Sequence, residues 1–168
     1  MVDMGKAIFQ SSLIPTLFET DQVIDKELIV NGKSFNVSCV SVGNPHCVIL
    51  TDELDETEIK KYGSSIETHA MFPNRINVQF AKLISRHEVE ILIWERGAGF
   101  TLASGSSSCA VASILKKKGL IDNEVTIKML GGKLKIKIDD QWNIQMTGEV
   151  KQICEGFISK EWIDQCQI

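Results

Sequence analysis

A chain of 168 residues, 43% apolar and 24% charged, has the composition of a soluble globular protein and is long enough to bury a hydrophobic core. Its net charge of -4 disfavours nucleic acid and anionic membranes as partners, because phosphate binding requires clustered Lys and Arg. No stretch approaches the ~20 apolar residues that cross a bilayer, and the first ten residues lack the basic and apolar parts of a signal peptide.

The first half of the chain is predicted to form strands with one helix between them. Residues 35–42 and 47–50 are rich in β-formers and lie on either side of a Gly-Asn-Pro turn. Residues 55–66 begin with acidic side chains and contain a glycine near their end, which is typical of a short surface helix. Two further strands, 76–84 and 88–94, are separated by Ser-Arg-His and are expected to form a hairpin.

The clearest helix is predicted at residues 105–118, which open with small residues, continue with larger apolar ones and end with three lysines before a glycine. Lysines at that end face the negative pole of the helix, so this basic run does not require an anionic partner. Small residues on all sides let neighbours approach, so we expect a buried helix. Strands follow at 124–129, 133–138 and 142–146, and the alternation of Leu and Ile with Lys in the second indicates a sheet with one wet face. The predicted class is α+β, a mostly antiparallel sheet wrapped around a central helix.

The five cysteines and three histidines bear on location and on metal binding. The cysteines form an odd set without a CxxC pair, which favours reduced thiols and a cytoplasmic location over a disulfide framework. The histidines stand apart from one another in the sequence, which argues against a metal site.

A candidate anion site lies at Ser104-Gly105-Ser106, where the predicted buried helix begins. The first amides of a helix have no partner within it and carry partial positive charge, so they can hold a carboxylate or a phosphate. Gly105 is expected to let a ligand approach the backbone. Serine is often a simple helix cap, and that interpretation of Ser104 remains open here.

Other candidate polar residues lie near strand ends. Glu95 and Arg96 are adjacent, so on a strand they would point to opposite faces, either as part of a rim ion pair or gripping the two charged ends of an amino acid. Asn44 lies in a turn, where asparagine is usually structural. Asn77 lies inside an apolar run, where its amide needs hydrogen-bond partners.

Several of these residues fall in segments that resemble motifs of one known family, the diaminopimelate epimerases, in its carboxy-terminal half. The resemblance is specific because the segments occur in the family's order over the whole chain. They are Val2–Gly5, Val40–His46, Phe72–Val78, Trp94–Gly99 and Leu102–Ala110.

The resemblance implies an isomerase of lysine and peptidoglycan biosynthesis that interconverts LL- and meso-diaminopimelate without pyridoxal phosphate or any other cofactor. In this family one cysteine acts as base and an opposed cysteine as acid, and the two come from different halves of the protein. Residues 1–168 would then be a single domain equivalent to the carboxy-terminal half, with the amino-terminal domain absent. The expected partners are diaminopimelate and a separate amino-terminal half, with a homodimer as a further alternative.

The resemblance also implies roles for individual residues. Substrate would be held by side chains that come before the helix, its α-carboxylate would rest on the first helix amides, and a histidine would support the site. These positions are Asn44, Asn77, Glu95 and Arg96 for the side chains, Gly105 and Ser106 for the amides, and His46 for support. Ser104 stands at the position of the family's catalytic cysteine.

That serine and the missing half are departures from the family. A thiol has a pKa of roughly 8.5 and a serine hydroxyl ionises far less readily, so we expect the chain alone to be inactive. Cys109 is no substitute, because it lies more than one helical turn beyond Ser104. Three alternatives remain: a catalytically degenerate ligand-binding or interaction domain, a related racemase or one-base enzyme independent of pyridoxal phosphate, and a serine engineered to trap a ligand.

Overall fold

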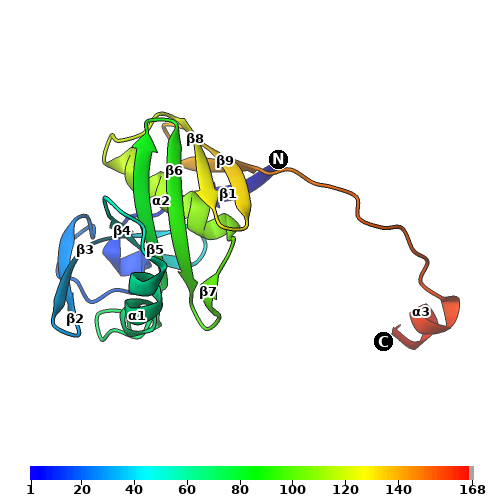
Figure 1. Ribbon diagram of the computed structural model, residues 1–168, viewed down its shortest axis with the longest axis horizontal. Helices are drawn as coiled ribbons and strands as arrows, with labels where there is room; N and C mark the ends of the chain where they lie inside the picture. The colour runs from blue at the N-terminus through cyan, green and yellow to red at the C-terminus, as the bar shows by residue number, and fades with distance from the viewer. Residues whose placement is uncertain (167–168) are drawn as a thin grey trace.

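The computed structural model describes residues 1–166, which form one large sheet wrapped around a central helix (Figure 1). The helices are the 3-10 helix η1 (Ser11–Leu13), α1 (Glu56–Glu67), α2 (Gly105–Lys117) and α3 (Lys160–Cys166). The strands are β1 (Val2–Lys6), β2 (Lys26–Val30), β3 (Lys33–Ser41), β4 (Pro45–Leu50), β5 (Asn77–Ser85), β6 (Glu88–Glu95), β7 (Gly99–Thr101), β8 (Glu124–Met129), β9 (Gly132–Ile138) and β10 (Asn143–Thr147).

The sheet has the strand order β1-β10-β9-β8-β6-β5-β4-β3-β2, and β7 pairs with β6 outside this path. Neighbouring strands are antiparallel except for β4 with β5 and β6 with β8. Parallel neighbours require a crossover connection, and these two crossovers contain α1 and α2 respectively. The predicted class, a mostly antiparallel α+β fold with one central helix, is therefore confirmed.

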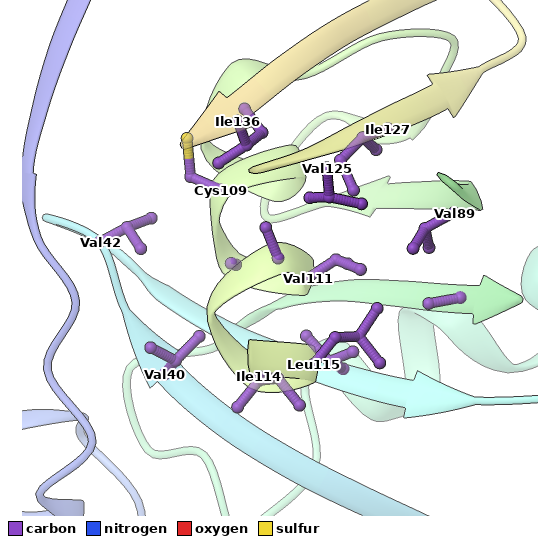
Figure 2. Close-up of a cluster of buried hydrophobic side chains, with 14 of the residues drawn as sticks. Val40, Val42, Val89, Cys109, Val111, Ile114, Leu115, Val125, Ile127 and Ile136 are labelled. Carbon is purple, nitrogen blue, oxygen red and sulfur yellow. The ribbon is translucent and has the colours of Figure 1, made fainter. Parts of the chain in front are cut away.

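Helix α2 is the centre of the larger of two hydrophobic cores. Every residue from 107 to 115 is buried, because serine and alanine on this helix let the strands pack closely around it. Figure 2 shows Val111, Ile114 and Leu115 of α2 among valines and isoleucines contributed by the surrounding strands. The second core lies under α1 and contains Ile59 and Ile66 on its buried face.

Both predicted helices are observed close to their predicted bounds. Asp55 caps α1, with its Oδ1 accepting the Thr57 amide at 2.7 Å. Helix α2 ends in the expected lysines, and Gly119 follows with φ of 70°, a conformation that favours glycine. The alternation in residues 133–138 is also confirmed, since Ile136 and Ile138 are buried while the lysines are exposed.

Three strands were not predicted from the sequence. β1 has no fully buried residue, β2 begins with two exposed charged residues, and β7 has only three residues, so none has a clear alternating pattern. These three strands are defined by their pairing with neighbouring strands, which their own sequences do not indicate.

The last described segment leaves the body of the protein. Residues 148–159 run away from the sheet without regular structure and lead into α3 (Figure 1). Among residues 1–166, no helix has the length and apolar content needed to cross a membrane.

Candidate functional site

The start of α2 lies at the predicted anion site. Ser104 is the N-cap, and its Oγ accepts the Ser107 amide at 3.4 Å and lies 3.5 Å from the Oγ of Ser106. The Ser104 amide in turn points to the thioether sulfur of Met129 at 3.4 Å. The capping interpretation of Ser104 is therefore correct as geometry, although it says nothing against a further role.

The amides of Gly105 and Ser106 have no acceptor among the described residues. Both residues are only partly buried, so these two donors remain available at the positive end of the helix. The reason for glycine at position 105 differs from the expected one. A Cβ there would lie 2.9 Å from the sulfur of Met146, so the space beside its Cα is already filled by the protein.

A continuous chain of hydrogen bonds joins Asn44 to this helix start. Asn44 Oδ1 lies 3.0 Å from Nε2 of the buried His46, and Nδ1 of His46 lies 3.3 Å from Gln79 Oε1. The Nε2 group of Gln79 donates to Ser107 Oγ at 3.1 Å, and the Ser107 amide donates to Ser104. The network therefore couples the orientation of the Asn44 amide to the first turn of α2.

The ring of His46 is neutral at physiological pH. Burial is the main cause that lowers the pKa of His46 from 6.5 to about 4, and the Gln79 hydrogen bond offsets this only in part. A neutral imidazole has a single N–H. It therefore donates to only one of its two amide neighbours, and the other must turn its own N–H toward the ring.

Asn77 has the partners that its position in an apolar run requires. It is 6% exposed, its Nδ2 donates to the carbonyl of Pro45 at 2.9 Å, and its Oδ1 accepts the Arg96 amide at 2.9 Å. Among residues 1–166, the second N–H of its amide has no acceptor. Asn77 also pairs with His46 across β4 and β5, so the two predicted residues are neighbours.

Glu95 and Arg96 lie at the end of β6, where the condition for opposite faces, that both residues belong to a strand, is not met. The strand ends at Glu95 and Arg96 begins a turn, so the alternation of a strand does not extend to Arg96. Arg96 is exposed and donates from Nη1 to the carbonyl of Asn74 at 3.1 Å, while Glu95 is partly buried.

Two buried polar residues of this region were missed from the sequence. Glu67 is 5% exposed and accepts the Trp94 indole N–H at 2.8 Å and the Gly97 amide at 2.9 Å. Gln79 is fully buried in the network described above. Each had a signal: Glu67 ends a helix, where a negative side chain is unfavourable, and Gln79 interrupts an apolar strand.

Asn44, Asn77 and Glu95 lie near the same end of three neighbouring strands, β4, β5 and β6. β5 carries both Asn77 and Gln79, two residues apart on one face and so ~7 Å from each other. The first lies beside the turn of Arg96, and the second contacts α2. The observed arrangement therefore connects the Asn, Glu-Arg and helix-start positions through β5.

A cleft of about 860 Å³ opens beside Ser104 and Gly105. Its other walls come from the β8–β9 turn and from the segment after β10, including Lys128, Lys133 and Lys151. The lining of this cleft does not include Asn44, Asn77, Glu95 or Arg96.

The cysteine thiols do not add a reactive group to this site. All five cysteines are free. Burial raises the pKa of the Cys109 thiol to about 12. Within residues 1–166, no three His, Cys, Asp or Glu side chains gather as a metal site would require.

The matching family model and the curated relatives described here share one name. Residues 38–153 match the family described as Diaminopimelate epimerase. "Diaminopimelate epimerase 2" of Nostoc sp. is 42% identical over 160 residues, which cover 95% of this chain and 56% of the relative. "Diaminopimelate epimerase" of Methanococcus maripaludis is 41% identical over 162 residues, with 94% and 57% covered. The chain thus spans about half the length of the curated relatives it matches.

A solved structure of another protein has a similar fold. The crystal structure of "Methylitaconate-delta-isomerase" superposes with a TM-score of 0.55 at 12% identity, covering 90% of this chain and 54% of that one. At such low sequence identity, this similarity shows the fold alone. Because the family match extends over more than half of its residues, the chain belongs to the diaminopimelate epimerase family.

Proposed function

We propose that this chain is the carboxylate-binding half of a diaminopimelate epimerase, an isomerase that interconverts LL- and meso-diaminopimelate without a cofactor. The observation that carries the proposal is the start of α2, where the amides of Gly105 and Ser106 are free and a hydrogen-bond network leads to Asn44. The names of the curated relatives support the choice of substrate. The reaction belongs to lysine and peptidoglycan biosynthesis.

In this proposal the α-carboxylate of the substrate rests on the Gly105 and Ser106 amides. Negative charge spreads onto that carboxylate as the α-proton leaves, and helix amides already aimed at it stabilise the charge without reorganisation. The neutral His46 positions Asn44 through its ring nitrogen and adds no charge that would compete for the carboxylate.

The two charged ends of an amino acid are matched by the Glu95-Arg96 turn. The Glu95 carboxylate suits an ammonium group, and the exposed Arg96 guanidinium suits a carboxylate. Asn77 contributes its free N–H and holds the Arg96 amide in place.

Inversion at the α-carbon needs a base on one face and an acid on the other. The base takes the α-proton and the acid returns a proton to the opposite face, so the product differs only in configuration. Ser104 lies at the helix start, beside the proposed carboxylate position, but its hydroxyl is a far weaker acid than a thiol. Cys109 cannot replace it, because its thiol is buried and its pKa is raised to about 12. We therefore propose that the second group comes from an amino-terminal half of the kind found in this family and that residues 1–168 without it are inactive.

Reconstitution tests this proposal. The amino-terminal half of the Nostoc relative is mixed with this chain carrying Ser104→Cys, and deuterium uptake from D₂O at the α-carbon of diaminopimelate is followed by NMR. We expect exchange with Ser104→Cys and a rate roughly 10²–10⁴-fold lower with the parent serine, the range a general acid or base contributes. As a matched control, Cys109→Ser added to Ser104→Cys retains the exchange. A folded complex with the Ser104→Cys chain that binds diaminopimelate but exchanges no deuterium would refute the epimerase proposal.

A further inference from the structure

We infer that Glu67 is a positioning residue that holds the Glu95-Arg96 turn in the conformation that binds the ligand. The ligand named here, diaminopimelate, rests on the proposed function. The hydrogen bonds of the Glu67 carboxylate to Trp94 and Gly97, here called the clamp, do not rest on it, because they join described residues.

The carboxylate of Glu67 binds both residues that flank Glu95 and Arg96 in the sequence. Its Oε2 accepts the Trp94 indole N–H at 2.8 Å, on the strand side. Its Oε1 accepts the Gly97 amide at 2.9 Å, on the turn side. One buried side chain therefore restrains the Glu-Arg pair from both ends.

Glu67 also restrains the loop that leads into Asn77. Its backbone carbonyl accepts the Ile76 amide at 3.2 Å, and its Oε1 lies 3.5 Å from Nη1 of Arg75. Arg75 has φ of 57°, an uncommon conformation for a residue with a side chain, which its surroundings must maintain. The loop and the turn meet again where the Arg96 guanidinium binds the carbonyl of Asn74. Glu67 thus contacts both segments that present proposed ligand groups.

Core packing alone does not explain a carboxylate at this position. Residue 67 is almost fully buried at the carboxyl end of α1, where burial and the helix dipole both disfavour negative charge. An apolar side chain would avoid both costs but would leave the Gly97 amide and the Trp94 indole without an acceptor. The Glu95-Arg96-Gly97 turn is itself poorly buried, so its order depends on such bonds.

Hydrogen exchange of the unmodified chain gives a first test that needs no substitution. Gly97 is an exposed turn residue, yet its amide donates to a buried carboxylate. We expect this amide to exchange at least about tenfold more slowly than an unstructured glycine, since a net hydrogen bond of ordinary strength gives such a factor. A Gly97 amide that exchanges at the unprotected rate would overturn the inference, even if Glu67 variants fail to fold.

Glu67→Gln is the informative variant, because glutamine has nearly the same shape but only one acceptor oxygen for the two N–H donors. We expect the Gly97 amide to lose about tenfold in protection and diaminopimelate to bind about tenfold more weakly, as followed by NMR titration. Glu56→Gln is the matched control, since it removes an equal charge from an exposed position on the same helix, and both quantities should stay unchanged. Trp94→Phe removes the indole donor and part of the ring but leaves the Glu67 carboxylate, so the protection of Gly97 should persist.

The outcomes separate this inference from the proposed function. Lower protection with unchanged affinity would assign Glu67 a purely structural role and overturn the inference. Unchanged protection in Glu67→Gln would overturn it as well. If the parent chain binds no diaminopimelate, alone or with the amino-terminal half, the proposed function fails, and the exchange of Gly97 in Glu67→Gln alone decides whether the clamp exists.

Discussion

The indole ring of Trp94 lies directly against the backbone of Gly63, in the middle of α1. A Cβ at position 63 would be 2.5 Å from Cδ2 of that ring and 2.7 Å from two further ring atoms. This close approach lets the indole N–H reach Glu67 one turn later on the same helix. A glycine in the helix interior thus serves the packing of α1 against the end of β6.

Gly63→Ala should therefore destabilise the protein. Alanine is the better helix former by ~1 kcal/mol, but the ring is rigid, so we expect an overpacking cost near the upper end of about 1–3 kcal/mol. Urea denaturation measures the free energy of unfolding. Ser64→Ala, at the exposed neighbouring position, is the control and should be neutral or slightly stabilising. A Gly63→Ala variant as stable as its parent would show that the ring can move away.

His46 should make stability depend on pH between about 4 and 6.5. Its pKa is about 4 in the folded protein and 6.5 when exposed, so in this window the unfolded chain binds more protons. Its contribution is fully present above pH 6.5 and is lost as the pH falls to 4, by roughly 3 kcal/mol in total. Denaturation at a series of pH values, with His46→Gln as reference, isolates this contribution. Parallel curves for the two proteins across the window would contradict a buried neutral ring.

Ser107 should contribute to stability through its bond to Gln79. Ser107→Ala leaves the Gln79 N–H without its acceptor inside the core, which typically costs about 1–3 kcal/mol. The single hydroxyl hydrogen of the adjacent Ser108 has two alternative acceptors, the Ser104 carbonyl at 2.9 Å and the Met129 thioether at 3.3 Å. Ser108→Ala leaves no buried N–H without its acceptor, so it should cost less. Thermal and urea unfolding compare the two variants. Equal losses would mean that the network adds nothing beyond local helix contacts.

The cysteines should divide into two classes of reactivity. Cys154 and Cys166 are exposed, whereas Cys39, Cys47 and Cys109 are buried, and burial raises the pKa of both Cys39 and Cys109. We expect a charged disulfide reagent at pH 8 to label two thiols rapidly in the native chain and the other three only after denaturation. The variant with serine at both exposed positions should be unreactive while folded. Rapid labelling of Cys109 in that variant would reopen its exclusion as an acid or base.

Much of the fold could be predicted because the relevant signals are local. The lysines and Gly119 at the end of α2, and the alternation of Ile136 and Ile138 with lysines, depend on neighbours in the sequence. The end of β6 between Glu95 and Arg96 could not be predicted in the same way, because no local pattern marks it. The start of the helix at Gly105 was predicted from the sequence. Its contact with Met146 was not, because Met146 comes from a distant strand.

The order of motifs along the chain was enough to identify the family. The anion site at the start of α2 stays a prediction, made from the sequence because helix amides carry their charge wherever the helix lies. Only the tertiary structure revealed that Asn44 reaches that helix through His46, Gln79 and Ser107, and that Glu67 binds both sides of the Glu95-Arg96 pair. These bonds join residues far apart in sequence. Buried polar groups take whichever partners the folded chain brings within hydrogen-bond distance, and no local pattern records that choice.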